Sequence, residues 1–139
     1  MDRYEEYEQK CEELRKANAE LLKKFEASLV ERGLSKKTIN RHVENVDLLI
    51  NDYMLRDDEP EAITSGQCSL DGFFYFFIRK CMWSTPANVK TTAASIKKFM
   101  KFLADNGDIS QETYKFMADD IKESVVYWQE DCATFNGCW

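Results

Sequence analysis

Glycine and proline are scarce in this chain, with five and two among 139 residues. Sheets joined by tight turns need more of both, because these residues supply the backbone conformations of turns. Hydrophobic residues make up 44% and aromatic residues 13%, which is enough apolar material for a buried core. The length fits a single domain. We therefore expect an all-α protein that folds as a compact bundle of four to five helices.

A long apolar run is also missing. A helix that spans a bilayer needs about 20 predominantly apolar residues, whereas the densest apolar stretch, residues 73–78, is six residues long. The first ten residues are charged and lack the apolar segment of a signal peptide. We expect no membrane association and a cytoplasmic location.

Residues that bind metals or act in catalysis are few. The chain has a single histidine, His42, and an odd number of cysteines, none in a C-x-x-C pair, at positions 11, 68, 81, 132 and 138. A zinc site needs about four Cys or His ligands in close pairs, and a disulfide framework needs an even, patterned set. Neither phosphate-binding glycine motif occurs. We expect no metal, cofactor, catalytic residue or small-molecule substrate, a half-buried structural His42 and unreactive thiols, except for an exposed, oxidation-prone Cys138.

The net charge of −6 argues against nucleic-acid binding when the chain is taken as a whole. The charges are nevertheless segregated along the sequence. Residues 35–43 and 72–104 carry nine basic residues and no acidic one, whereas residues 44–61 and 105–139 are each strongly acidic. Such segregation predicts separate basic and acidic faces.

Five helices are predicted, at about residues 4–32, 35–56, 69–82, 86–106 and 111–131. They form one domain over residues 1–131, followed by a flexible tail over 132–139. Each helix after the first begins at a residue suited to the N-cap, and glycines end the first and fourth helices; these residues are Ser35, Ser69, Thr85, Ser110, Gly33 and Gly107. The first helix carries an apolar stripe at steps of three and four, made of Leu14, Ala17, Leu21, Phe25 and Leu29.

The apolar segment 73–78 fits either a buried helix or a buried strand, because periodicity does not separate the two. The preceding Ser69 and the helical surroundings favour a buried helix.

Two segments carry chemistry suited to phosphates, Gly33–Val43 and Ser84–Gly107. Each begins with a capped helix N-terminus and presents hydroxyl, amide and basic side chains. Free backbone N–H groups and the helix dipole attract anions there, and lysines add counterion release. The same residues equally fit a structural role, in which Ser35 and Thr85 cap helices and the lysines are solvated.

The order and spacing of these segments resemble a known family. A leading helix, then Gly33-Leu34-Ser35-Lys36-Lys37-Thr38 opening a second helix, then a helix ending in Phe102-Leu103-Ala104-Asp105-Asn106-Gly107, is similar to the SAM-like N-terminal (core-binding) domain of phage integrases and other tyrosine recombinases. The likeness covers about residues 20–110. It implies a helical bundle that clamps one face of duplex DNA during DNA integration and recombination.

The resemblance also implies the contact residues. The positions that would lie against DNA are Ser35, Lys36, Lys37, Thr38, Arg41, Asn88, Lys90, Thr91, Lys97 and Lys101. In several members a last helix packs against a neighbouring protomer. By this likeness, Phe116 and Tyr127, on the outer side of the fifth helix, would contact a second copy or a recombinase.

The family's catalytic residues are absent. The chain has no His-x-x-Arg sequence, and its predicted single domain leaves no room for the catalytic Arg and Tyr. We therefore expect no enzyme, but either the N-terminal part of a recombinase or a stand-alone relative. The alternative is a helical protein-interaction or regulatory module without DNA affinity, which would use the acidic fifth helix. An acidic helix folded over the basic face would reconcile the net charge with the lysines.

Overall fold

All regular structure in the computed structural model is helical, and no strand occurs among the residues it describes, 2–56, 59–65 and 68–137. The all-α prediction is therefore confirmed. Where the sequence predicts one domain over 1–131, the contacts group the chain into two compact units, Met1–Cys68 and Ser69–Trp139, which we call unit 1 and unit 2. Within the described ranges, no helix is both long and apolar enough to cross a membrane.

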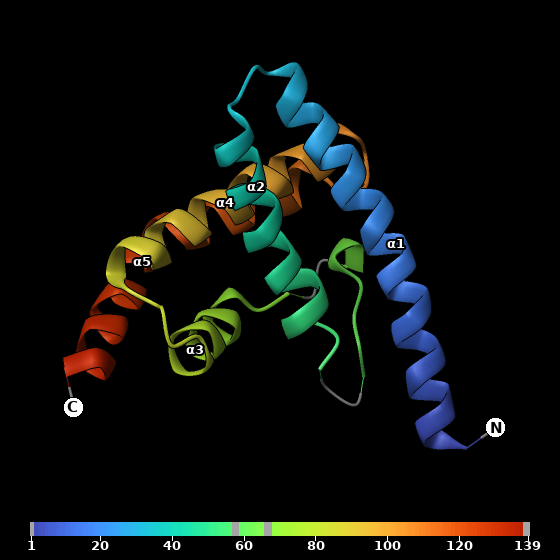
Figure 1. Ribbon diagram of the computed structural model, residues 1–139, viewed down its shortest axis with the longest axis horizontal. Helices are drawn as coiled ribbons and strands as arrows, with labels where there is room; N and C mark the ends of the chain where they lie inside the picture. The colour runs from blue at the N-terminus through green and yellow to red at the C-terminus, as the bar shows by residue number, and fades with distance from the viewer. Residues whose placement is uncertain (1, 57–58, 66–67, 138–139) are drawn as a thin grey trace. The chain divides into compact units, whose positions relative to one another are not determined.

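Unit 1 is built on two neighbouring helices, α1 (Arg3–Glu31) and α2 (Lys36–Asp47), drawn in blue and teal in Figure 1. Gly33 joins them with φ +77°, a left-handed conformation that favours glycine. The Ser35 side chain accepts a hydrogen bond from the backbone N–H of Thr38 at 3.2 Å. The predicted helix end and the predicted cap are both confirmed.

The buried side of α1 differs from the predicted stripe. Phe25 and Leu29 are buried as expected, but Ala17 is exposed, and the buried positions nearer the N-terminus are Cys11 and Asn18. The Asn18 side-chain amide donates to the carbonyl of Ile50 at 3.1 Å. Asn18 is accommodated on the buried side because its amide has an acceptor there. That acceptor lies 32 residues further along the chain.

The second predicted helix, 35–56, is not a single α-helix. After α2 the backbone continues as a π-helix, η1 (Leu48–Tyr53), in which Leu49 and Ile50 are buried. A short 3-10 helix, η2 (Ile63–Ser65), lies between the second and third predicted helices, and Ile63 is buried there. Residues 57–58 and 66–67 lie outside the described residues.

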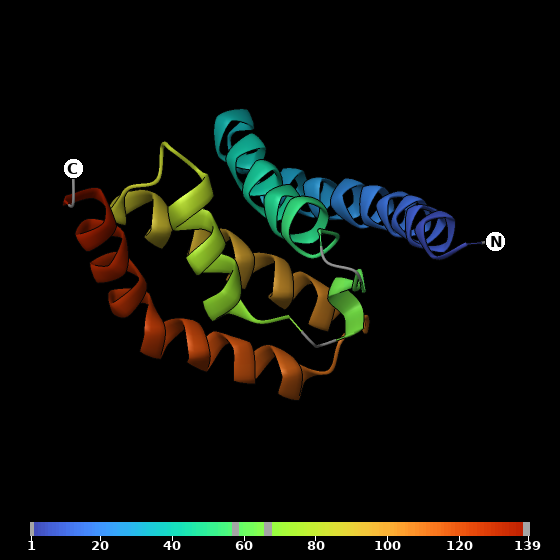
Figure 2. The same ribbon diagram turned by 90° about the horizontal axis from the view of Figure 1, so that it is seen from below.

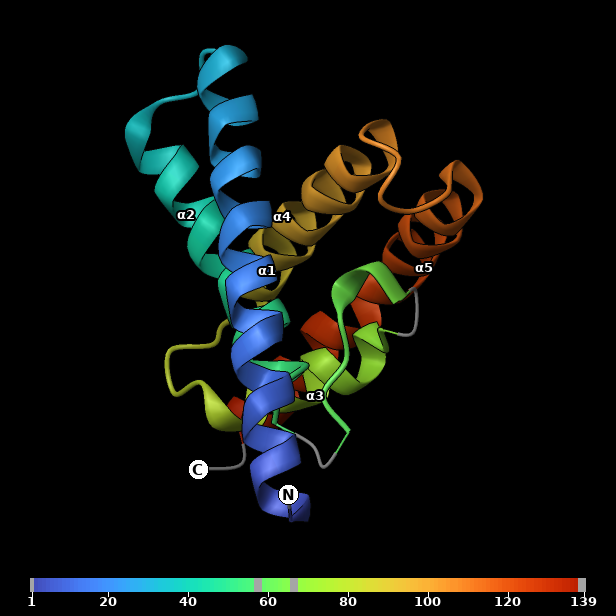
Figure 3. The same ribbon diagram turned by 90° about the vertical axis from the view of Figure 1, so that its right-hand side faces the viewer.

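Unit 2 contains α3 (Leu70–Lys80), α4 (Pro86–Asp105) and α5 (Gln111–Gly137), and α5 packs against both α4 and α3 (Figure 2). Ser69, Thr85 and Ser110 each accept a hydrogen bond from the backbone N–H three residues later, so the predicted caps are confirmed. Gly107, with φ +81°, lies in the turn that reverses the chain from α4 into α5 (Figure 3).

The apolar segment 73–78 is helical, so the strand alternative is excluded. Phe74 is buried and stacks on Trp128 of α5, with ring centroids 4.3 Å apart. The indole N–H of Trp128 donates to the Asp71 carboxylate at 2.7 Å. An ion pair also joins α3 to α5. The Arg79 guanidinium donates two hydrogen bonds to the Asp131 carboxylate, at 2.9 and 3.1 Å.

The predicted tail is wrong for residues 132–137, which continue α5. Cys132 is fully buried, and the Asn136 amide donates to the backbone carbonyl of Ser84 at 2.9 Å. The Cys132 thiol donates to the Ser84 hydroxyl 48 residues back, and the Asn136 bond reaches 52 residues back, so neither contact is visible in the local composition. Residues 138–139, including Cys138, lie outside the described residues.

Candidate nucleic-acid interface

The outer face of α4 carries the lysines that the sequence singles out. Positions 87, 90, 94, 97 and 101 follow at steps of three and four, so they share one side of the helix. Lys90 and Lys97 are exposed, and the one position between them on this side is Ala94. Among the residues that the structure describes, neither lysine forms an ion pair. We call Lys90, Lys97 and Lys101 the α4 lysine face.

Lys101 is the most constrained member of the α4 lysine face. Its ammonium lies 3.1 Å from the Asp105 carboxylate and 5.5 Å from the centre of the Tyr114 ring. The ion pair is half exposed, so it contributes little to stability and is open to exchange with another anion. Lys101 thus already has an anionic partner, whereas Lys90 and Lys97 are open to contact with a phosphate.

Asn88 and Thr91, both predicted to contact DNA, make hydrogen bonds within their own unit. The Asn88 amide donates to the carbonyl of Trp83 at 2.9 Å, and the Thr91 hydroxyl donates to the carbonyl of Ala87 at 3.0 Å. Both side chains are half-buried. Their observed contacts hold the start of α4, and a DNA contact by either remains a prediction.

The other predicted contacts lie at the start of α2 in unit 1. Lys36, Lys37 and Arg41 are exposed, and the first turn of α2 contains no acidic residue. The Ser35 hydroxyl donates to the Thr38 hydroxyl at 3.0 Å while it caps the helix. This segment and the α4 lysine face belong to different units, and each is described within its own unit.

The acidic fifth helix leaves much of the α4 lysine face open within unit 2. α5 packs against α4 and α3, and its buried residues are Met117, Ile121, Trp128 and Cys132. Lys90 and Lys97 remain exposed with α5 in place. Masking of these two lysines by the acidic helix is therefore not observed within the unit.

Phe116 and Tyr127 are exposed on α5, to 74% and 66%. The sequence predicts this outward position, and it is confirmed. A contact with a second copy or a recombinase remains a prediction.

The sequence reasoning missed a second exposed apolar site in unit 2. Met82 and Trp83, in the loop between α3 and α4, are exposed to 99% and 63%. The sequence prediction placed Met82 at the end of a buried helix, but α3 ends at Lys80. The tryptophan immediately before the Ser84-Thr85-Pro86 start of the next helix was the available signal.

Metal ligands do not converge in the described part of the chain. His42 is buried rather than half-buried, and no group of three or more His, Cys, Asp or Glu residues could hold a metal ion there. Cys11, Cys81 and Cys132 are buried cysteines, and Cys68 is half-buried. Burial raises the pKa of the Cys68 thiol to about 12, so little thiolate forms at neutral pH.

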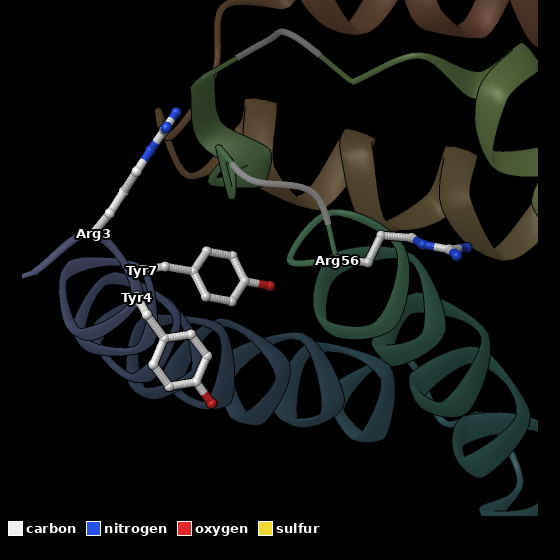
Figure 4. Close-up of a pocket in the computed structure, with 4 residues that line it drawn as sticks. All are labelled: Arg3, Tyr4, Tyr7 and Arg56. Atoms are coloured by element: carbon white, nitrogen blue, oxygen red, sulfur yellow. The ribbon is translucent and has the colours of Figure 1, made fainter.

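A hollow of about 510 Å³ lies near the start of α1, lined by Arg3, Tyr4, Tyr7 and Arg56. Figure 4 shows the Arg3 and Arg56 side chains extending in different directions, not toward a shared point. The Tyr7 hydroxyl donates to the carbonyl of Leu55 at 2.6 Å. Tyr7 thus joins the start of α1 to Leu55, and the two arginines do not form a convergent anion site.

Comparison of the chain with protein-family models, with curated proteins and with solved structures finds no match.

Proposed function

We propose that this chain is a non-catalytic DNA-binding domain of the phage integrase or tyrosine recombinase type, a SAM-like helical bundle that binds duplex DNA mainly through phosphates. The observation that carries the proposal is the α4 lysine face. Lys90 and Lys97 are exposed and without an ion pair in the described residues, on a helix with no acidic residue in its first turn. Lysines arranged in this way along a helix can release counterions from a DNA backbone.

The start of α2 supports the same function. Its first turn has exposed Lys36 and Lys37, a hydroxyl cap at Ser35 and the positive end of the helix dipole. Phosphate oxygens accept hydrogen bonds from such groups without reading the base sequence. Binding should therefore be sensitive to salt and weakly selective for sequence.

The test is fluorescence anisotropy with a labelled duplex of about 30 base pairs, at about 50 and 200 mM salt. We expect the triple variant Lys90→Glu, Lys97→Glu, Lys101→Glu to abolish binding, because it replaces three attractive charges with repulsive ones. The helical content should stay unchanged in circular dichroism, since these side chains are exposed or half-buried.

The matched control is Lys10→Glu, Lys23→Glu, Lys24→Glu. It changes the net charge by the same amount at exposed positions of α1, outside both basic segments. The control should lose far less affinity than the α4 variant. Equal loss in both variants would show that net charge, not the α4 lysine face, governs binding.

The exposed rings of α5 favour one alternative, a protein-interaction or regulatory module without DNA affinity. Phe116 and Tyr127 lie on an outer side that also carries Asp119 and Glu123. Aromatic side chains on a helix surface are suited to contact with another protein. An absence of duplex binding by the parent chain at about 50 mM salt would favour this alternative.

A further inference from the structure

The loop between α3 and α4 displays two large apolar side chains to solvent. Met82 is 99% exposed and Trp83 is 63% exposed, and the two residues are adjacent in the chain. Leaving such side chains in water forgoes the favourable burial of their apolar surface. Large apolar side chains exposed together in one loop are a candidate binding surface.

Hydrogen bonds fix the backbone on both sides of this pair. The buried Ser84 donates from its hydroxyl to the carbonyl of Ile78 at 3.2 Å and from its backbone N–H to the carbonyl of Cys81 at 3.0 Å. The carbonyl of Trp83 itself accepts from the Asn88 amide. The exposed pair is thus presented by a supported backbone.

The end of α5 braces the same loop. The Asn136 amide donates to the carbonyl of Ser84 at 2.9 Å, and the Gln129 amide donates to the carbonyl of Pro86 at 3.0 Å. A loop braced by α5 in this way loses little conformational entropy when a ligand binds, which favours affinity.

The charge around the loop selects the class of ligand. Lys80 precedes the exposed pair, Lys90 follows on α4, and both are exposed. The chain has no acidic residue between Asp71 and Asp105. Asp131 of α5 reaches this region, but it is paired with Arg79. An apolar pair flanked by cations is complementary to bases flanked by phosphates.

We infer that Met82 and Trp83 form an apolar wedge that contacts bases in duplex DNA at a step that is opened or kinked. This inference rests on the proposed function, and it adds a base contact to the phosphate contacts of the α4 lysine face. Methionine side chains inserted between base steps unstack and kink duplexes in other DNA-binding proteins. An indole ring stacks on any base, so the contact is tolerant of sequence.

The experiment compares two labelled duplexes of about 30 base pairs, one fully paired and one with a central two-base mismatch. Unpaired bases are cheaper to unstack, so we expect the parent chain to prefer the mismatched duplex by about tenfold, as one stacked base contributes. Trp83→Ala should remove this preference. It should leave the salt dependence unchanged, because it removes no charge.

Phe116→Ala is the matched control. It removes another exposed aromatic ring of unit 2, from α5 and away from the loop. The control should keep the preference for the mismatched duplex. Circular dichroism of both variants checks that they fold, as expected for substitutions at exposed positions.

The two proposals fail in different ways. If the parent binds both duplexes and Trp83→Ala retains the full preference, or if the parent shows no preference, the wedge is wrong and phosphate binding stands. If the parent binds neither duplex at about 50 mM salt, the proposed function and the wedge are both wrong. The exposed pair would then be assigned to contact with a protein.

Discussion

Asn18 is a polar residue on the buried side of α1, and its surroundings explain why. Its amide donates to the carbonyl of Ile50 at 3.1 Å and to the Asn51 side-chain oxygen at 2.8 Å. Both acceptors belong to the π-helix η1. Asn18 thus donates to both a backbone and a side-chain acceptor of η1, which satisfies its buried amide.

We expect Asn18→Leu to lower the free energy of unfolding by about 1–3 kcal/mol, because it leaves the carbonyl of the buried Ile50 and the side-chain oxygen of the half-buried Asn51 without their donor. Urea unfolding followed by circular dichroism measures the change. Ala17→Leu is the control, since position 17 is exposed and should change stability by less than about 0.5 kcal/mol. Parent-like stability of Asn18→Leu would show that the two hydrogen bonds contribute little.

At the scale of elements, α3 and α5 are joined by stacking and by a hydrogen bond that meet at Trp128. The Trp128 ring stacks on Phe74, and its indole N–H donates to Asp71. Trp128→Phe keeps an aromatic ring but removes the donor, so we expect a loss of about 1 kcal/mol for the hydrogen bond. Trp128→Ala should cost about 3–5 kcal/mol, because it also leaves a cavity.

Chemical unfolding of the two variants separates these contributions. Tyr127→Ala serves as the control, because it alters the neighbouring position, which is 66% exposed, and should leave stability nearly unchanged. Equal losses for Trp128→Phe and Trp128→Ala would contradict the idea that ring packing dominates the contact between α3 and α5.

The elements also show which features a sequence reveals. The caps at Ser35 and Thr85 are predictable because each bonds to a backbone N–H three residues away. The buried side of α1 is not predictable, because Asn18 depends on acceptor oxygens more than 30 residues away in the chain. The end of α5 is missed for the same reason, since Asn136 is held by Ser84, 52 residues away.

The candidate site also has features that local sequence reveals and features that it does not. The spacing of Lys90 and Lys97 predicts a shared helix face, and the structure places both residues exposed on α4. The display of Trp83 escapes local patterns, because it depends on where α3 ends and on braces from α4 and α5. Periodicity indicates which side of a helix is apolar. It does not indicate which loop is held by hydrogen bonds from distant parts of the chain.

For the whole molecule, net charge is a poor guide to binding. Acidic residues outnumber basic ones in both units, by sixteen to eleven in residues 1–68 and by nine to eight in residues 69–139. Salt at physiological concentration screens exposed charges beyond about 8 Å. A duplex held against the α4 lysine face therefore responds mainly to that face, and distant acids weaken binding most at low salt.

Salt dependence can also show whether both units contact DNA. The logarithm of affinity falls with the logarithm of salt concentration by about 0.9 for each phosphate neutralised. We expect Lys90→Gln, Lys97→Gln, Lys101→Gln to reduce the magnitude of the slope by about 2.7. Lys36→Gln, Lys37→Gln, Arg41→Gln should reduce it similarly if the start of α2 binds the same duplex.

Anisotropy titrations over a range of salt concentrations, on one duplex, measure all three slopes. Reductions in both triple variants would mean that unit 1 and unit 2 each neutralise phosphates, as the two basic segments predict. A reduction confined to the α4 variant would assign binding to unit 2 and leave Ser35 as a helix cap only. An unchanged slope in both variants would contradict phosphate binding by these segments. Each phosphate that is no longer neutralised must reduce the number of counterions released, and therefore the slope.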